Sequence, residues 1–381
     1  MKVATVVGAR PQFVKAAIVS KALRATQQIE NVLVHTGQHY DADMSQVFFE
    51  ELEISPPKHH LHVGSGSHGA QTGRMLEGLE QVFELENPDW VLVFGDTNST
   101  IAGALAAAKL HILVAHVEAG LRSFNRKMPE ELNRVLTDHA SDLLLAPTRL
   151  AVANLLQEGI GDGRVRLVGD VMYDATLYYG NRAEKKSKIL ERLKLAKKSY
   201  VLSTIHRAEN TNSSEKLRSI FLGLSNVAMQ LPVILPVHPR TRNAILNDRD
   251  SAEAAKGIRF IDPVGYLDMT ILERNARLIA TDSGGIQKEA FFYSVPCVTL
   301  RTETEWQELV DMGWNRLTPP DSPDVVSSAI LDGLCRAPKE TASPYGDGHA
   351  SEQIVQILSD WDQVTARQSL SSSLISQASA I

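Results

Sequence analysis

The sequence predicts an α/β fold of two consecutive units of similar size, each a parallel β-sheet covered by helices. Three observations predict this fold. The chain has 381 residues, which suits two or three domains. Short, largely apolar runs of strand length alternate with helix-length segments, which is the pattern of βαβ units in a doubly wound sheet. The same alternation then restarts after residue 170.

Most strands expected in the first half are almost continuously apolar, as parallel strands covered on both faces are. The expected strands are Val3–Val7, Asn31–His35, Trp90–Phe94, Leu113–Val117 and Leu143–Ala146. The expected helices are Gln12–Ala25, His68–Glu84, Ser99–Leu110, Pro129–Ala140 and Leu150–Glu158. Ligands of open α/β sheets bind beyond the carboxyl ends of the strands, so the residues that follow these strands are the candidates for a site.

The second half repeats the pattern. Its expected strands are Tyr200–Ser203, Val233–Pro236, Arg259–Ile261, Leu278–Thr281 and Cys297–Leu300, and its expected helices are Ser214–Leu231, Tyr266–Asn275, Gly285–Tyr293 and Pro323–Leu334. We expect the two units to join at Val168–Asp174 or in the charged stretch Arg182–Lys198, with a first domain of residues 1–170 and a second of residues 171–349. Residues 366–381 are rich in serine, and we expect them to form a frayed tail.

Composition excludes several classes of protein. Apolar residues make up 43% of the chain and charged residues 22%, as in ordinary folded proteins, and a net charge of −6 argues against a nucleic-acid-binding protein. No run of 18 apolar residues occurs, so no membrane-spanning helix is expected, and the start MKVATVVGAR is typical of a buried strand and not of a signal peptide. Two distant cysteines, Cys297 and Cys335, suit a reducing cytoplasm and exclude a disulfide scaffold or a cysteine-based zinc site.

Two cations follow the first expected strand. The segment GARPQFVK is a tight turn that opens a helix, with Arg10 and Lys15 at its start. Cations there oppose the helix dipole, so an anion such as phosphate would explain them, and the alternative is two solvated surface charges. The glycine spacing is not GxGxxG, so a nicotinamide cofactor is not indicated.

Three carboxylates follow strands or begin a helix in the same unit. Asp96 ends one expected strand, Glu118 ends the next, and Glu130 lies in the first turn of the helix that begins at Pro129. Asp96 alone could be a helix cap, and Glu130 alone could match a helix dipole. Together, however, they place three acids at one edge of the sheet, an arrangement suited to acid–base chemistry.

The second unit supplies cations and backbone donors after its strands. The histidines and arginine of these segments could hold a diphosphate, although a single histidine of this kind is more often structural; they are His206, Arg207 and His238. The run Ser283, Gly284, Gly285 opens a helix whose free N–H groups can bind an anion, and Glu289 further along could accept hydrogen bonds from a ribose. No metal-ligand spacing occurs, and His59, His60 and His62 are expected in a solvated polar loop.

The chain resembles the non-hydrolysing UDP-N-acetylglucosamine 2-epimerases in eight segments: GARPQFVKAA, TGQHYD, GDTNST, HVEAGLRS, PEELNR, TIHRAEN, PVHPR and DSGGIQKEA. These segments occur in order and extend over most of the chain, and a chance match to one would not bring the other seven. The resemblance implies a glycosyltransferase-B-like fold with two Rossmann-like domains and an active site in the cleft between them. It also implies a homodimer and a C-terminal helix, at about residues 350–365, that packs back onto the first domain.

The resemblance also implies the chemistry. A base removes the C2 proton of UDP-N-acetylglucosamine while UDP leaves C1, and UDP then adds back to 2-acetamidoglucal as a proton reaches the opposite face; no cofactor or metal is needed. The implied catalytic residues are Asp96, Glu118, Glu130 and His206. The implied contacts to the UDP-sugar are Arg10, Lys15, Arg207, His238, Ser283, Gly284, Gly285, Glu289 for the ribose and Arg301. The sequence leaves open which carboxylate serves which face of C2.

Two departures from the family pattern bear on substrate and regulation. The segment TGQHYD replaces a TAQHR-like segment linked to activation by substrate, so allosteric activation is not expected. The segment RTETEW, which begins at Arg301, is closer to members that act on UDP-2,3-diacetamido-2,3-dideoxyglucuronic acid. We expect UDP-N-acetylglucosamine as substrate, with UDP-N-acetylmannosamine supplied to surface polysaccharide. The alternatives are the uronic acid, a retaining glycosyltransferase, a non-catalytic sensor of nucleotide sugars, and a hydrolysing variant.

Overall fold

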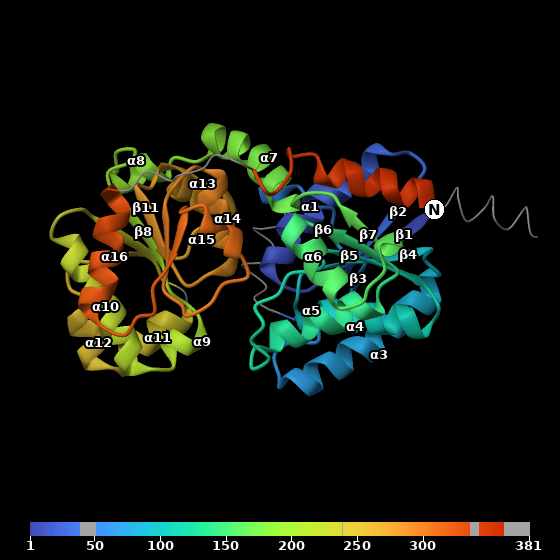
Figure 1. Cartoon of the computed structure of the whole chain (residues 1–381), viewed down its shortest axis with the longest axis horizontal. Helices are drawn as coiled ribbons and strands as arrows, with labels where there is room; N and C mark the ends of the chain where they lie inside the picture. Colours follow the sequence, from blue (N-terminus) through green and yellow to red (C-terminus); the bar gives the residue numbers. More distant parts are fainter. Residues whose placement is uncertain (39–50, 238, 336–342, 362–381) are drawn as a thin grey trace, which may run out of the picture. The chain divides into compact units, whose positions relative to one another are not determined.

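The structure is a computed structural model, and it describes residues 1–38, 51–237, 239–335 and 343–361 (Figure 1). The described chain forms two compact units. Unit 1 contains residues 1–175 together with those from Pro344 onward, and unit 2 contains Thr176–Ser343. The division falls inside helix α7 (Val171–Lys186). The expected tail, residues 366–381, lies outside the described residues.

Unit 1 is built on a parallel sheet in the order β3-β2-β1-β4-β5-β6-β7. Its strands are β1 (Lys2–Val7), β2 (Glu30–His35), β3 (His59–His60), β4 (Trp90–Phe94), β5 (Leu113–Val117), β6 (Leu143–Ala146) and β7 (Val165–Leu167). All five strands expected in this half are present, and β3 and β7 are additional. The strand order reverses at β1 and β4, which is where ligands of doubly wound sheets bind.

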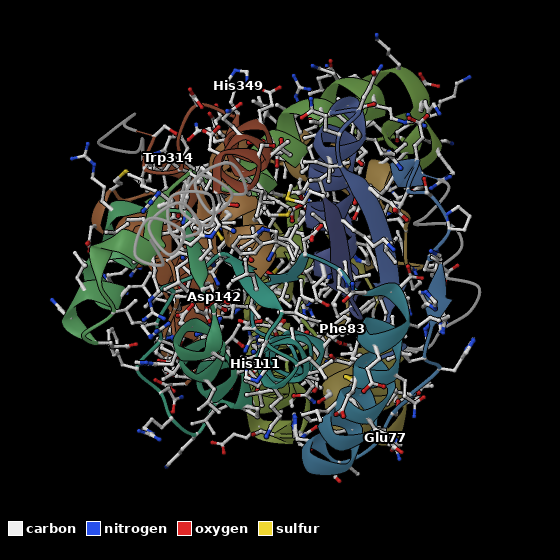
Figure 2. The ribbon with its side chains drawn as sticks, turned by 90° about the vertical axis from the view of Figure 1, so that its right-hand side faces the viewer. Glu77, Phe83, His111, Asp142, Trp314 and His349 are labelled. Atoms are coloured by element: carbon white, nitrogen blue, oxygen red, sulfur yellow. The ribbon has the colours of Figure 1, made fainter. Side chains whose placement is uncertain are left out.

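Helices cover both faces of this sheet (Figure 1). They are α1 (Arg10–Ala25), α3 (His68–Glu86), α4 (Asn98–Lys109), α5 (Pro129–Ala140) and α6 (Arg149–Gln157), with a 3₁₀ turn at Asp162–Arg164. The alanine-rich α4 packs against both α3 and α5. Helix α3 is amphipathic, because Phe83 is buried in the core whereas Glu77 is exposed on its outer side (Figure 2).

The C-terminal residues 350–361 are helical and belong to unit 1, where Figure 1 draws them in red. Asp174 caps this helix, because its carboxylate accepts hydrogen bonds from the backbone N–H groups of Ala350 (3.1 Å) and Ser351 (2.7 Å). At its other end, Trp361 packs edge-on against Trp90 of β4, with 5.8 Å between ring centroids. A helix far along the sequence therefore completes the core of unit 1.

Unit 2 is built on a second parallel sheet, in the order β10-β9-β8-β11-β12-β13. Its strands are β8 (Val201–Thr204), β9 (Val233–Pro236), β10 (Arg259–Ile261), β11 (Leu278–Thr281), β12 (Cys297–Thr299) and β13 (Asn315–Leu317). Its helices are α8 (Ile189–Leu193), α9 (Ala208–Thr211), α10 (Ser214–Ala228), α11 (Pro239–Asn247), α12 (Arg249–Ala254), α13 (Tyr266–Asn275), α14 (Gly284–Phe292), α15 (Gln307–Asp311) and α16 (Pro323–Cys335). The expected α/β fold with two Rossmann-like units is thus confirmed.

The expectation of a solvated histidine loop is wrong for His59 and His60, whereas His62 is exposed and lies outside any strand, as expected. His59 and His60 form β3, and the His59 ring lies 2.6 Å from Glu86 of α3. His60 stacks on His35 of β2 with 4.3 Å between ring centroids. A two-residue strand is too short to show a periodic pattern, and its residues are polar, so the sequence did not predict it.

Among the described residues, no helix is long and apolar enough to cross a membrane.

Candidate functional site

The turn after β1 is organised by one buried side chain, that of Gln12. Its Oε1 accepts hydrogen bonds from the backbone N–H groups of Gly8 (2.8 Å) and Ala9 (3.1 Å). Its Nε2 donates to the Phe94 carbonyl at the end of β4 (2.9 Å). Gln12 thus occupies two amides of this turn that could otherwise face an anion, and it ties the turn to the neighbouring strand. Arg10 is the first residue of α1.

Asp96, just beyond β4, is held by helix α5. Its Oδ2 accepts hydrogen bonds from Nε (3.0 Å) and Nη2 (2.8 Å) of Arg134. Its backbone carbonyl accepts a hydrogen bond from Asn133 Nδ2 (2.9 Å). About a third of the Asp96 side chain is exposed. The carboxylate is therefore anchored by a cation while one face stays open to solvent.

Glu118, the residue after β5, has a strained backbone and a buried side chain. Its φ is +70°, a left-handed value that costs free energy in any residue except glycine. Its carboxylate forms an ion pair with Lys15 of α1, and both side chains are largely buried. A Cβ on Gly95 would lie 3.3 Å from Glu118 Oε2 and 3.5 Å from Lys15 Nζ, so glycine leaves room for this pair. The strain is retained at a position that aims an acid toward the edge of the sheet.

The first turn of α5 carries two adjacent acids with different surroundings. Glu131 is buried, and its carboxylate accepts hydrogen bonds from the backbone N–H groups of Ser123 and Phe124 (both 2.9 Å). It therefore fixes the loop before the helix. Glu130 is half-buried, and no hydrogen bond or ion pair links its carboxylate to another described residue. Of the two, Glu130 is the acid left available for a ligand.

In unit 2, the buried Asp282 organises the segment after β8. Its carboxylate accepts hydrogen bonds from the backbone N–H groups of His206 (3.1 Å) and Arg207 (3.0 Å) and from Asn210 Nδ2 (3.1 Å). The His206 ring is partly exposed, with Nδ1 3.4 Å from Asp282 Oδ1. The Asp282 carboxylate is thus engaged by hydrogen bonds within unit 2. It fixes the backbone of His206 and Arg207, whose side chains lie at the edge of the sheet.

Helix α14 begins beside Arg207 without a side-chain cap. Ser283 is its N-cap residue, but the Ser283 side chain makes no capping hydrogen bond. A Cβ on Gly284 would lie 3.8 Å from Arg207 Nη2, an ordinary contact, and a Cβ on Gly285 would meet no protein atom. Packing within unit 2 therefore does not require either glycine, and the side of the helix start at Gly285 is open.

Arg301 is buried in an ion pair inside unit 2. Its two terminal nitrogens each lie 3.2 Å from an oxygen of the Glu305 carboxylate. Glu305 Oε2 would in turn lie 3.7 Å from a Cβ on Gly284. Trp306, the next residue, donates a hydrogen bond from its indole N–H to the Gly284 carbonyl (3.0 Å). Arg301 thus lies next to the start of α14, with its charge already matched by Glu305.

Glu289, on α14, lies in a buried cluster of acids and tyrosines. Its Oε1 is 3.4 Å from the hydroxyl of Tyr266, the first residue of α13. Burial, and then the charge of Glu289, raise the pKa of Glu273 well above its usual range. Burial and Glu289 also raise the pKa of Tyr266. Glu289 itself is largely buried.

The structure thus brings the expected residues together in two groups, one in each unit. In unit 1, Glu118 pairs with Lys15, and Asp96 pairs with Arg134 of α5, the helix that carries Glu130 in its first turn. In unit 2, Arg207 lies beside the start of α14. His238 is outside the described residues. Sequence reasoning missed Arg134 and Asp282, which position these groups. The four-residue spacing of Glu130 and Arg134 puts both on one helix face, and this signal could have identified Arg134. Among the described residues, no group of three His, Cys, Asp or Glu side chains could hold a metal.

Comparison with known proteins gives consistent matches. A family model described as UDP-N-acetylglucosamine 2-epimerase matches residues 21–359. A Methanococcus maripaludis protein named UDP-N-acetylglucosamine 2-epimerase homolog is 51% identical over 361 residues, which are 94% of this chain and 99% of that protein. The UDP-2,3-diacetamido-2,3-dideoxy-D-glucuronate 2-epimerase of Pseudomonas aeruginosa is 47% identical, with the same coverage.

A solved structure is also similar. It is the UDP-GlcNAc 2-epimerase of Methanocaldococcus jannaschii in complex with UDP-GlcNAc and UDP. That chain is 45% identical, with a TM-score of 0.88, and the match covers 94% of this chain and 99% of that one. This likeness confirms the expected glycosyltransferase-B-like fold.

Proposed function

Because the chain belongs to the UDP-N-acetylglucosamine 2-epimerase family, we propose that it inverts C2 of UDP-N-acetylglucosamine to give UDP-N-acetylmannosamine. The observation that supports the proposal is the pair of acids that follow the neighbouring strands β4 and β5, Asp96 and Glu118, each held by a cation of unit 1. Acid–base groups at fixed positions are what a proton transfer at carbon needs. The further steps follow from this arrangement.

The proposed reaction is an elimination followed by an addition. A carboxylate takes the proton from C2, the electron pair of that bond forms the C1–C2 double bond, and the C1–oxygen bond breaks to release UDP. UDP then adds back to C1 while an acid gives a proton to the opposite face of C2. We propose Asp96, Glu118 and Glu130 as the acid–base set, with His206 assisting. No net proton is consumed.

The proposed grip on UDP comes mainly from unit 2. Arg207 has no hydrogen bond or ion pair to its guanidinium from another described residue, so it has a positive charge to offer. The uncapped start of α14 adds backbone donors. The proposed phosphate contacts are Arg207, Ser283, Gly284, Gly285, Arg10, Lys15 and His238, with Glu289 for the ribose. Lys15 would have to share its charge with Glu118.

A second substrate is favoured by one specific observation. The relative from Pseudomonas aeruginosa, 47% identical, is named for UDP-2,3-diacetamido-2,3-dideoxy-D-glucuronate. That sugar carries a carboxylate, which a cation such as Arg301 could bind. Arg301 is paired with Glu305, so the sugar carboxylate would have to displace or join that partner. We therefore keep UDP-N-acetylglucosamine as the first proposal.

One experiment tests both substrates. The protein is incubated with each UDP-sugar in deuterated water, and C2 of the sugar is followed by NMR. Elimination predicts deuterium at C2 and the signals of the C2 epimer. Epimerisation with the C2 hydrogen fully retained would contradict the mechanism, and activity only on the uronic acid would reverse the order of the two substrates.

We also propose a homodimer in the cytoplasm. The two cysteines, Cys297 and Cys335, are both free, which suits a reducing compartment. Light scattering of the purified chain measures its mass in solution. A mass of one chain at working concentration would contradict the homodimer.

A further inference from the structure

A buried histidine and a buried aspartate lie beneath the carboxylates of unit 1. His116 of β5 and Asp138 of α5 are both fully buried, and His116 Nδ1 lies 2.7 Å from Asp138 Oδ1. The other ring nitrogen, Nε2, lies 2.7 Å from the backbone carbonyl oxygen of Gly95. The imidazole therefore bridges a helix and the residue immediately before Asp96.

The hydrogen-bond partners limit where protons can lie in this pair. The Gly95 carbonyl can only accept, so Nε2 of His116 carries a proton. Asp138 Oδ2 faces two groups that can only donate, the backbone N–H of Gly120 (3.1 Å) and Nη2 of Arg122 (2.8 Å). An ionised Asp138 accepts from both of these and from a second proton on Nδ1. The imidazole is then positively charged, with every polar atom of the pair satisfied.

The surrounding charges support an ionised Asp138. Its burial is the largest influence and acts to raise the pKa, but His116 and Arg122 outweigh burial and lower the pKa below its usual value. Arg122 in turn donates from Nε (2.7 Å) and Nη2 (2.6 Å) to the Glu158 carboxylate. Two cations and two anions are thus joined in one largely buried network that is neutral overall.

We propose that His116 and Asp138 are positioning residues that hold the backbone of the acid–base site. His116 fixes the carbonyl of Gly95, one residue before Asp96, and Asp138 fixes the N–H of Gly120, two residues after Glu118. One rigid pair thereby sets the separation of two carboxylates that belong to different strands. The proposal rests on the proposed function, because it assigns the pair to that reaction.

The first test reads the charge of His116 without any substrate. A ¹⁵N–¹H spectrum of histidine-labelled wild-type protein, assigned with His116→Gln, shows whether each ring nitrogen carries a proton. We expect both nitrogens of His116 to carry a proton, because each faces an oxygen that can accept a hydrogen bond. A neutral ring with an unprotonated Nδ1 would overturn the proposed charged pair.

The second test separates positioning from stability. Asp138→Asn removes the negative charge that holds His116, Gly120 and Arg122, so we expect kcat to fall about 10- to 100-fold with KM changed less than threefold. The matched control is Glu86→Gln, which removes a buried carboxylate of unit 1 from Lys2, Lys58 and His59. We expect Glu86→Gln to lose stability while keeping kcat within twofold.

The outcomes distinguish the two proposals. Unchanged kcat in Asp138→Asn would overturn the positioning role, and so would an equal fall of kcat in Glu86→Gln. If Asp138→Asn does not fold, His116→Gln takes its place in the same comparison. A wild-type chain that epimerises neither sugar would contradict the proposed function instead, and the spectrum of His116 would still test the charged pair.

Discussion

The charged side chains at the carboxyl edges of the two sheets differ in whether they are paired within their own unit. In unit 1 two of the three candidate acids have cations of the same unit beside them, since Asp96 pairs with Arg134 and Glu118 with Lys15. In unit 2 the carboxylate of Asp282, at the edge of the sheet, mainly accepts hydrogen bonds from backbone N–H groups. The guanidinium of Arg207 has no acid partner among the described residues. Two acids at the edge of the unit 1 sheet thus have their charges matched within the unit, whereas Arg207 gives unit 2 a positive charge that an anion can match.

Under the proposed function, this difference suits unit 1 to proton transfer and unit 2 to binding the diphosphate. Acids held by cations stay in fixed places, which suits proton transfer to and from a substrate carbon. A cation beside uncapped backbone donors suits a diphosphate, which brings its own negative charge. The predictions that follow are ordered from the largest expected effect to the smallest, and each would break or sharpen the contrast between the units.

The largest effect is expected from the acids of unit 1. Asp96→Asn, Glu118→Gln and Glu130→Gln should each lower kcat by roughly 10²–10⁴-fold, because each removes a group that takes or gives a proton. Deuterium incorporation at C2, followed by NMR, measures the loss. The control is Glu77→Gln on the exposed side of α3 (Figure 2), which should change nothing. Full activity in all three variants would end the assignment of acid–base chemistry to unit 1.

The next effect concerns the anion site of unit 2. Arg207→Ala removes the cation, and Gly285→Val fills open space beside the start of α14, so each should weaken UDP binding about 10- to 100-fold. The rise in melting temperature with added UDP measures this change. Arg218→Ala, which removes an exposed arginine of α10 from its pairing with Asp250, should keep the full UDP effect. If Arg207→Ala keeps it too, the nucleotide binds elsewhere.

Acid should act on unit 1 through His35. Burial, and then the charges of His60 and His62, lower the pKa of His35 from 6.5 to about 4. The unfolded chain therefore takes up a proton as the pH falls below 6.5, while the folded chain resists it, so stability is lost as the pH falls from 6.5 toward 4. We expect about 2 kcal/mol of this loss between pH 7.5 and pH 5.

The variant His35→Phe isolates this contribution. It keeps an aromatic ring against Phe13, whose ring centroid lies 5.1 Å from that of His35, but it cannot titrate. Urea unfolding of both proteins at pH 7.5 and pH 5 compares their stabilities. The variant should lose less stability than the wild type on acidification. An identical acid loss in the two proteins would mean that His35 is not responsible.

Unit 2 should show the opposite dependence through Glu273. Its raised pKa means that the folded chain keeps a proton that the unfolded chain releases, so stability is present at low pH and falls as the pH rises above 4.5. Glu273→Gln removes this cost, so it should stabilise the protein more as the pH rises above 4.5. Urea unfolding of both proteins at pH 4 and pH 8 measures the gain, and a gain that does not grow with pH would contradict this explanation.

Several features of the fold could be predicted because they depend on local pattern. The strands with long apolar runs, such as β4 and β5, were expected within one or two residues of where they lie. The short strands β3, β7 and β13 have two or three residues each, which is too few for a periodic pattern, so they were not expected. Which residues follow the long strands was predicted for the same local reason.

The partners within the candidate site could not be predicted in this way. Arg134 and Asp138 lie on α5, where acids and bases also have an ordinary explanation as a solvated helix face. Gln12 looked like a plain helix residue, yet it holds the turn after β1 and the end of β4 together. Each of these roles depends on a hydrogen bond between distant segments.

By itself, then, the sequence determined which side chains end the strands and open the helices, because short-range periodicity and backbone preferences decide those positions. Only the tertiary structure decided which acid meets which cation. Lys15 and Glu118 are 103 residues apart, and they pair because β1, β4 and β5 are neighbours in the sheet. That strand order follows from how the whole unit buries its apolar surface, and no local segment encodes it.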